Sequence, residues 1–288
     1  MKIAIVTDSI TNLTKEDLGK YPFIRYVYLN VIINGKSYTD ILEMDNARLF
    51  AAIDEGASYS TSQPSPQAFH NVYEELLKDH DFIFSLHCTE NVSGTVNSGR
   101  LAKDMIEDGD SKIRVVDMNN ASIGVENGVI QVAKAIADGK SLEDVRKVVE
   151  YYEHNSVLRL TIDDLSTLVK SGRMSKTKAT IGNLLNIKPI IGFNSETKLD
   201  VVDKVRTRKK VVGWLVDALA KDVASRGPQI VRITHVNALD VAHTLKSLME
   251  EQLGDQVEVH LSNEIGPVMA VHFGRGGFGA SWIDRDIN

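Results

Sequence analysis

The sequence predicts an α/β protein built from two α/β domains, with a ligand site between them. In the first part of the 288-residue chain, short apolar runs alternate with amphipathic helical patterns, which favours a mainly parallel sheet with helices on both faces. After about residue 160, strand-like runs follow one another directly, which favours a mixed or antiparallel sheet with helices. We therefore expect domains at 1–160 and 161–288, and a cleft between such halves is a frequent place for a small-molecule site.

The first half contains four buried-strand patterns and four helical patterns. Its apolar runs are short, and in the segments between them apolar residues recur every three to four positions. A different pattern at 26–33 is followed by Asn34-Gly35 and a second short run at 36–38, which predicts a β-hairpin. The expected strands cover 3–6, 82–86, 113–116 and 158–161, and the expected helices cover 66–78, 95–107, 121–138 and 141–154.

The second half contains more strands than helices. Consecutive strand patterns without an intervening helix cannot all be joined by parallel crossovers, so at least some of them pair antiparallel. The expected strands cover 187–193, 198–204, 229–236, 257–262, 266–273 and 278–283, and the expected helices cover 207–224 and 238–253.

Composition excludes several classes of protein. The formal net charge of −6 argues against a general nucleic-acid binder, whose binding face is usually basic. No apolar stretch approaches the ~18 residues of a transmembrane helix, so we expect a cytoplasmic protein without a transmembrane segment. The single cysteine, Cys88, cannot form an internal disulfide and is interpreted as a small buried residue rather than a nucleophile.

Two clusters of hydroxyl groups each precede a helical pattern. In the segment TSQPSP at 61–66, Ser65 is a good N-cap and Pro66 a good first helical residue. The segment Ser93-Gly94-Thr95 repeats the arrangement after the strand pattern at 82–86. Hydroxyl groups and the free N–H groups of a helix start can together hold an anion. We call each segment, with its hydroxyl groups and the helix start that follows, a hydroxyl corner. Two such corners suggest that one small acidic group is held between them.

Other chemistries receive less support from the sequence. The segment 274–279, GRGGFG, matches a dinucleotide-binding pattern but is followed by a strand-like run, and no phosphate-binding loop of the GxxxxGK type occurs. The eight histidines lack the spacing of a metal site. Ser93, His272 and Asp8 could form a catalytic triad, so an acyl hydrolase or transferase with Ser93 as nucleophile stays open as the alternative function.

Several motifs occur in the order seen in DegV proteins, and the chain resembles the DegV family of fatty-acid-binding proteins over about residues 3–283. The pairing of TSQPSP with a later SGT at this separation is specific. The motifs are Thr7-Asp8-Ser9, TSQPSP at 61–66, SGT at 93–95, SGRMS at 171–175, NIKP at 186–189, RTR at 206–208, and GPV at 266–268 followed by His272.

The resemblance implies a carrier that encloses one long-chain fatty acid, similar to palmitate or oleate, and needs no cofactor. It implies that a separate fatty acid kinase, which brings ATP, phosphorylates the bound acid; transient membrane contact is compatible with this role. The implied contacts of the carboxyl group are Thr61, Ser62, Ser93, Gly94 and His272. Arg206 is carried over as a contact for the kinase or the new phosphate, and Arg173 as either such a contact or a cap on the preceding helix.

Three residues depart from the family pattern. Glu90 stands where relatives commonly carry a serine, and because a carboxylate would repel a bound anion we expect it to face solvent. Glu126 replaces a residue that is usually small. Arg275 replaces the proline of the late motif, which adds a cation and loosens the turn. These three departures bear on the length of acyl chain that the pocket prefers and on the identity of the partner protein more than on the fold.

Overall fold

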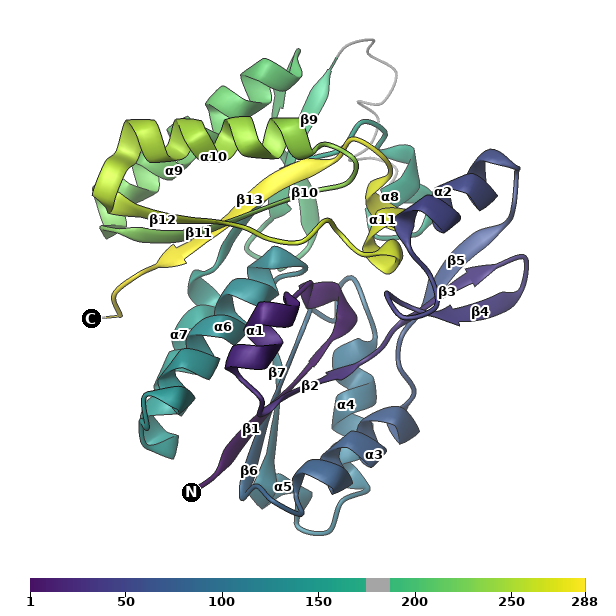
Figure 1. Cartoon of the computed structure of the whole chain (residues 1–288), viewed down its shortest axis with the longest axis vertical. Coiled ribbons are helices and arrows are strands. Elements are labelled where there is room, and N and C mark those ends of the chain that lie inside the picture. Colours follow the sequence, from purple (N-terminus) through teal and green to yellow (C-terminus); the bar gives the residue numbers. More distant parts are fainter. Residues whose placement is uncertain (175–186, 288) are drawn as a thin grey trace.

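The computed structural model describes residues 1–174 and 187–287, which form two α/β units and a small three-stranded sheet (Figure 1). Ser175 and Asn186, the outer residues of two of the family motifs, lie outside the described residues. The expected fold class is confirmed: the first unit has a parallel sheet and the second a mixed sheet, and both carry helices.

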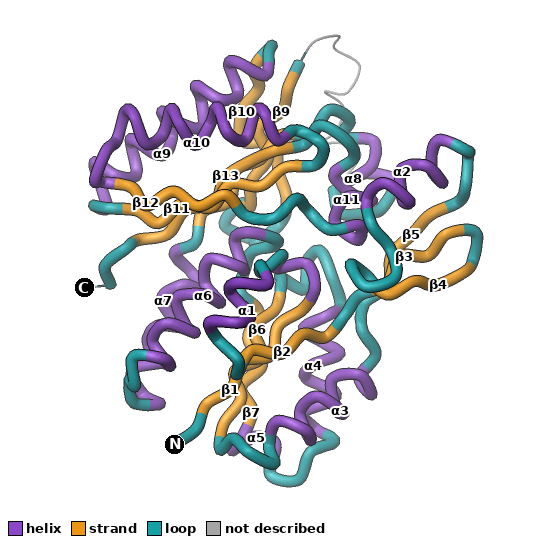
Figure 2. Tube along the Cα trace, in the orientation of Figure 1, coloured by secondary structure: helices purple, strands orange, loops and turns teal. Residues whose placement is uncertain are grey.

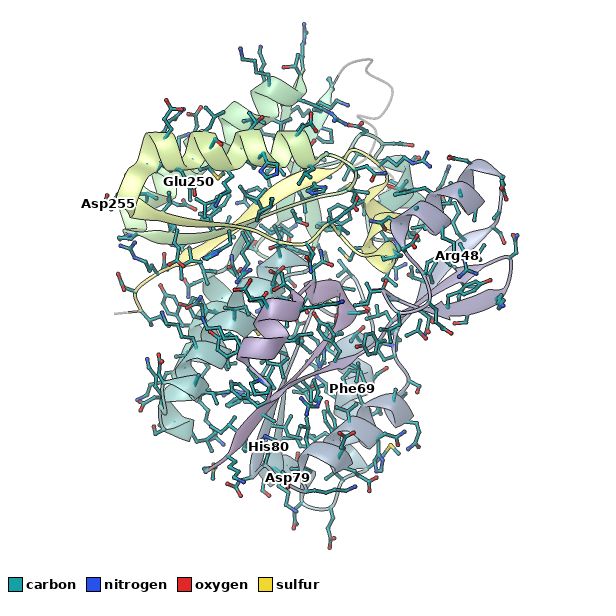
Figure 3. All side chains as sticks on the ribbon, in the orientation of Figure 1. Arg48, Phe69, Asp79, His80, Glu250 and Asp255 are labelled. Atoms are coloured by element: carbon teal, nitrogen blue, oxygen red, sulfur yellow. The ribbon has the colours of Figure 1, made fainter. Side chains whose placement is uncertain are left out.

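The first unit is a parallel sheet with helices on both faces. Its strand order is β2-β1-β6-β7, and each neighbouring pair is parallel. α3 and α4 cover one face, where Phe69 and Tyr73 pack against Val6 and Ile83; Figure 3 shows Phe69 inside this unit. The elements are β1 (Ile3–Asp8), η1 (Ser9–Thr11), α1 (Lys15–Lys20), β2 (Ile24–Val27), α3 (Pro66–Leu76), β6 (Phe82–His87), α4 (Thr95–Asp104), α5 (Gly109–Lys112), β7 (Ile113–Asp117), α6 (Ile123–Ala137) and α7 (Leu142–Asn155).

The small sheet is an insertion that leaves the first unit after β2. The expected hairpin is confirmed, because Asn34 and Gly35 both adopt the positive φ angles, 49° and 79°, of a tight turn between two strands. Figure 1 shows this sheet and its helix at one side of the molecule, beside α11. The elements are β3 (Asn30–Ile33), β4 (Lys36–Thr39), α2 (Asn46–Asp54) and β5 (Tyr59–Ser62), in the strand order β4-β3-β5.

The second unit is a six-stranded mixed sheet in the order β10-β9-β8-β13-β11-β12. Only β11 and β12 pair in parallel; the other neighbours are antiparallel. Figure 2 shows α9 and α10 together on the outer side of this sheet. The elements are β8 (Val157–Thr161), α8 (Ser166–Lys170), β9 (Lys188–Phe193), β10 (Leu199–Val205), α9 (Arg208–Arg226), β11 (Gln229–His235), α10 (Leu239–Leu253), η2 (Gly254–Gln256), β12 (Val257–Leu261), α11 (Pro267–Phe273) and β13 (Phe278–Asp284).

Helix α6 joins the two units. Most of its residues are buried, because it contacts β1 and β6 of the first sheet and also β11 and β13 of the second. A helix that is buried on most of its surface must be largely apolar, and the buried positions of its sequence, IGVENGVIQVAKAIA, meet this requirement except at Glu126 and Asn127. The core is therefore continuous from one sheet to the other.

Two elements differ from the expectations. Residues 267–273 form α11 rather than part of a strand, because Pro267 stands at the first helical turn and the Asp40 carboxylate accepts a hydrogen bond from Val268 N at 3.0 Å. The strand near 158–161 does not extend the parallel sheet. It pairs antiparallel with β13 and β9 in the second unit.

Candidate binding site for an acidic apolar ligand

A cavity of about 330 Å³ lies where the two units and the small sheet meet. The ends of β1 and β6 and the start of α6 form one wall, and β8, β9 and β10 form the opposite wall. α11 and β5 close one side. The lining residues are mostly apolar and comprise Ile10, Leu29, Thr61, Ser62, Gln63, Cys88, Val92, Ser93, Ala121, Leu158, Leu160, Leu168, Arg173, Phe193, Leu199, Val268, Met269, His272 and Phe273.

Thr61 and His272 meet at the polar end of this cavity. Strand pairing with Val31 of β3 positions Thr61, and α11 positions His272, whose backbone carbonyl accepts a hydrogen bond from the Thr167 hydroxyl at 2.6 Å. Thr61 Oγ1 lies 3.0 Å from His272 Nε2. Burial, together with the nearby charge of Arg173, lowers the pKa of His272 to about 4, so its imidazole is neutral at pH 7. Nδ1 of His272 is buried and has no hydrogen-bond partner among the described residues.

Gly94 brings the second hydroxyl corner against the first. A Cβ atom at Gly94 would lie 2.0 Å from Oε1 of Gln63, so only glycine allows this approach. The Gln63 amide reaches on to donate to Ser98 Oγ at 3.0 Å, which ties the end of the small sheet to α4. Gly94 is the N-cap of α4 and supplies no side-chain cap to that helix. The two corners therefore lie against each other, and that they hold an acidic group between them stays a prediction. Gln63, which makes the contact between them, was not identified from the sequence.

Ser93 lines the cavity at the start of α4. Its hydroxyl lies 2.9 Å from Thr95 Oγ1 and accepts from the Thr95 backbone N–H at 3.4 Å. Ser62, next to Thr61, lines the cavity as well. The hydroxyls of Thr61, Ser62 and Ser93 can donate to the oxygens of an acid.

Arg173 binds the carbonyl at the end of α8, and its role as a contact for the partner or the phosphate stays a prediction. Its Nη1 donates to the Ser171 carbonyl at 2.6 Å, just after α8, and its Nε donates to the Val92 carbonyl at 3.0 Å, next to Ser93. It also lines the cavity, so its positive charge lies near the polar end. Arg206, in contrast, is exposed in the bend between β10 and α9 and is absent from the lining.

Ser93, His272 and Asp8, the triad of the hydrolase alternative, each contact other side chains rather than one another. Asp8 Oδ2 lies 2.7 Å from His87 Nδ1, and His87 Nε2 lies 2.6 Å from Ser85 Oγ, all fully buried inside the first unit. His272 contacts Thr61, and the hydroxyl of Ser93 contacts Thr95. Cys88 is buried as expected, and burial raises the pKa of its thiol, which keeps it protonated.

The three departures have distinct structural roles. Glu90 faces solvent, as expected, and pairs with Arg100 at 2.6 Å. Glu126 is fully buried and pairs with Arg232 of β11 at 2.8 Å. Arg275 binds both carboxylate oxygens of Asp54 and stacks over Phe50, so it links the loop after α11 to α2.

Most residues that line the apolar part were not identified from the sequence. Leu158 and Leu160 alternate along β8, which is a sequence signal for one shared face. No pattern in the sequence pointed to Asp40. Its buried carboxylate accepts hydrogen bonds from the Ser9 hydroxyl and from Val268 N, and the second bond fixes the start of α11. Burial raises the pKa of Asp40 to about 6.

The described part of the chain offers neither a metal site nor a membrane-spanning helix. Within residues 1–174 and 187–287, no three His, Cys, Asp or Glu side chains gather closely enough to hold a metal ion. None of the helices in this described part is both long and apolar enough to cross a membrane.

Comparison with known proteins agrees with this architecture. A DegV domain-containing protein of Caldanaerobacter subterraneus subsp. tengcongensis is 31% identical over 275 residues, which is 95% of each chain. The structure of a fatty-acid-binding DegV family protein from Thermus thermophilus matches with a TM-score of 0.91 and 30% identity, over 99% of this chain and 100% of that one. DegV of Bacillus subtilis, a fatty-acid-binding protein, matches with a TM-score of 0.87 and 28% identity, with the same coverage.

The family model described as an uncharacterised protein of the DegV family matches residues 2–285. This span contains both α/β units and every residue of the cavity. The chain belongs to the DegV family.

Proposed function

We propose that this protein binds a long-chain fatty acid, similar to palmitate or oleate, and presents its carboxyl group to a separate fatty acid kinase in the cytoplasm. The observation that carries the proposal is the cavity itself, which is apolar over most of its length and collects hydroxyls, a neutral histidine and an arginine at one end. Two similar structures, from Thermus thermophilus and Bacillus subtilis, are of fatty-acid-binding proteins.

The polar end matches the needs of a carboxyl group. Thr61 and Ser93, which both line the cavity, would supply hydroxyl donors from the two corners, and the backbone N–H groups of Ser62 and Gly94 are proposed as further donors. The neutral imidazole of His272 contacts Thr61 Oγ1 and can orient that hydroxyl toward the acid. Arg173 adds a positive charge on the same side, which favours the ionised form of the ligand.

The apolar part supplies the affinity. Burial of a methylene group is worth about 0.8 kcal/mol, so a sixteen-carbon tail contributes roughly ten kcal/mol before the costs of ordering and association are subtracted. A soluble carrier needs such a cavity because a free fatty acid tail would otherwise remain in contact with water.

The carrier role follows from the chemistry of the ligand. A carboxylate is a poor acyl donor until it is activated, and this sequence contains no phosphate-binding loop of its own. We propose Arg206 as the contact for the partner or the new phosphate because its side chain is exposed in the bend before α9 and free of the cavity lining. Arginine binds phosphate through paired donors.

The first test is the ligand content of the purified protein. We expect solvent extraction and mass spectrometry to recover a long-chain fatty acid in stoichiometric amount. Delipidated protein should melt at a higher temperature when palmitate or oleate is added, because a ligand at a hundred times its Kd stabilises the folded state by about 2.7 kcal/mol. Hexadecanol, which lacks the carboxyl group, should stabilise less. Absence of both extracted acid and thermal shift would overturn the proposal.

The second test separates ligand binding from presentation. Arg206→Ala should leave fatty acid affinity unchanged and reduce acyl-phosphate formation by a reconstituted kinase about tenfold, since a charge-assisted hydrogen bond is worth about 1.5–3 kcal/mol. Lys221→Ala, an exposed cation elsewhere on α9, is the matched control. Equal loss of affinity and phosphorylation would make Arg206 structural. Acyl-phosphate formation by the isolated chain with ATP and magnesium would refute the carrier model.

A further inference from the structure

Four polar side chains form a row of hydrogen bonds in the core of the first unit. His87 stands in the middle of the row: its Nδ1 lies 2.7 Å from Asp8 Oδ2, and its Nε2 lies 2.6 Å from Ser85 Oγ. Ser85 Oγ in turn lies 2.7 Å from the Tyr73 hydroxyl. All four side chains are fully buried, and none of them lines the cavity. We call this set the buried network.

The hydrogen bonds of the buried network run in one direction. Burial raises the pKa of the Tyr73 phenol, so this group stays protonated and donates to Ser85 Oγ. The Ser85 hydroxyl then donates to His87 Nε2, and the N–H at Nδ1 of His87 donates to the Asp8 carboxylate. In this order each donor meets one acceptor, as buried polar groups require. Loss of any one member therefore leaves a buried neighbour without its partner.

The buried network contacts both helices that begin at the hydroxyl corners. Tyr73 belongs to α3, which begins at the first corner, and Phe69 of the same helix meets the His87 ring edge-on, with 5.0 Å between the ring centroids. α4, which begins at the second corner, packs against α3 (Figure 1). A Cβ atom at Gly99 of α4 would lie 3.1 Å from the Tyr73 hydroxyl, closer than ordinary van der Waals contact. The hydroxyl of Tyr73 therefore limits how closely α4 approaches α3.

The buried network also reaches the ends of two strands beside the cavity. β1 ends at Asp8, whose Oδ1 accepts from the backbone N–H of Ile10 at 3.2 Å, and Ile10 lines the cavity. β6 ends at His87, and the next residue, Cys88, lines the cavity as well. The network thus holds together the end of β1, the end of β6 and the helices of both hydroxyl corners.

Recognition of a carboxyl group depends on this arrangement more than binding of an apolar tail does. A hydrogen bond weakens steeply once its donor and acceptor move out of line, whereas the hydrophobic effect is non-directional. Thr61 and Ser93 stand in different corners and both line the cavity. A change in the separation of the corners would take one of these hydroxyls away from its carboxylate oxygen, while the same change would cost the tail little.

We propose that the buried network sets the separation of the two hydroxyl corners and thereby gives the protein its preference for a carboxylic acid over an uncharged lipid with the same tail. His87, which joins Asp8 to Ser85, is the central positioning residue. This inference rests on the proposed function, because it assumes that the ligand places its carboxyl group between Thr61 and Ser93.

The experiment compares two ligands that differ only in the head group. Delipidated protein is titrated with palmitate and with hexadecanol, and the ratio of the two Kd values measures the preference for the acid. Tyr73→Phe, Ser85→Ala and His87→Asn each interrupt the network and should lower this preference about three- to tenfold, the effect of one lost or misplaced hydrogen bond. Affinity for hexadecanol should change less than affinity for palmitate. The double variant Tyr73→Phe with Ser85→Ala should fall no further than Ser85→Ala, because both changes break the same row.

Tyr152→Phe is the matched control. Tyr152 is another buried tyrosine of the first unit, and its hydroxyl donates to the Asp284 carbonyl at 3.1 Å, but it belongs to neither the cavity lining nor the network. This variant should keep the wild-type preference. Thermal unfolding of every variant separates a change of preference from a change of stability. Tyr73→Phe removes a single oxygen atom and keeps the ring, so it decides the question if Ser85→Ala or His87→Asn does not fold.

The outcomes distinguish this inference from the proposed function. If the wild type binds neither ligand, or binds both equally, the proposed carboxyl site fails and the network loses its role with it. If the wild type prefers palmitate but the network variants keep that preference, or lose affinity for both ligands alike, the network is merely structural and the inference fails while the proposed function stands. A lowered preference in Tyr152→Phe would also overturn the inference. A lowered preference in the network variants, with Tyr152→Phe unchanged, would establish it.

Discussion

Replacing Glu126 by alanine should lower the free energy of unfolding by about 3–5 kcal/mol, because it leaves the Arg232 guanidinium buried without its carboxylate. Only 8% of the Arg232 side chain is exposed, and none of the Glu126 side chain is. Glu126 Oε1 also accepts from the Ser262 hydroxyl at 2.9 Å, so two donors lose their acceptor at once. The loss lies at the contact between α6 and the second sheet, which is where the two units join.

The measurement is denaturant unfolding at pH 8. Burial raises the pKa of Glu126 to about 7, so the carboxylate is mainly ionised at that pH. Glu251→Ala, at an exposed position of α10, should change stability by less than about 0.5 kcal/mol. The double variant Glu126→Met with Arg232→Met should recover much of the loss, since an apolar pair of similar volume needs no desolvation of charge. A loss below about 1 kcal/mol in Glu126→Ala would show that Arg232 finds water instead.

Removing the hydroxyls of Thr61 and Ser93 together should weaken fatty acid binding by about 2–6 kcal/mol. Each hydroxyl that binds a carboxylate contributes about 1–3 kcal/mol, while the burial of the tail is unaffected. Each single alanine variant should lose part of this affinity. His272→Ala should act in the same direction, because it removes the partner of Thr61 Oγ1.

Calorimetric titration of delipidated protein with oleate measures this effect, and circular dichroism checks that the fold is retained. Ser60→Ala is the matched control: Ser60 is exposed and neighbours Thr61 on β5, where successive side chains point to opposite faces. Unchanged affinity in the double variant would remove both hydroxyls from the site. Loss of ester hydrolysis in Ser93→Ala, with fatty acid affinity unchanged, would instead support the hydrolase alternative.

Local features of the fold could be predicted because their causes are local. Ser65 caps α3 and Pro66 occupies its first turn, since a hydroxyl acceptor and a preset φ angle favour a helix start whatever surrounds them. Asn34-Gly35 made a hairpin turn for the same kind of reason. The two hydroxyl corners were visible as well, because each precedes a helix that the apolar periodicity predicts.

Features that depend on distant partners could not be predicted. The run at 267–273 is apolar enough for a strand or a helix, and the Asp40 carboxylate, more than two hundred residues earlier in the chain, helps to make it a helix. Likewise, the apolar residues of β8 indicate a buried strand but not the sheet to which it belongs.

The sequence by itself determined the fold class, the family resemblance and the hydroxyl groups of the polar end, because composition, periodicity and short motifs carry that information. Only the tertiary structure showed that Gln63 packs on Gly94, that Glu126 pairs with Arg232, and that Leu158, Phe193 and Leu199 line one cavity. These contacts join residues that are tens or about a hundred positions apart. The packing of two sheets around α6 creates them, and no local pattern in the chain encodes that packing.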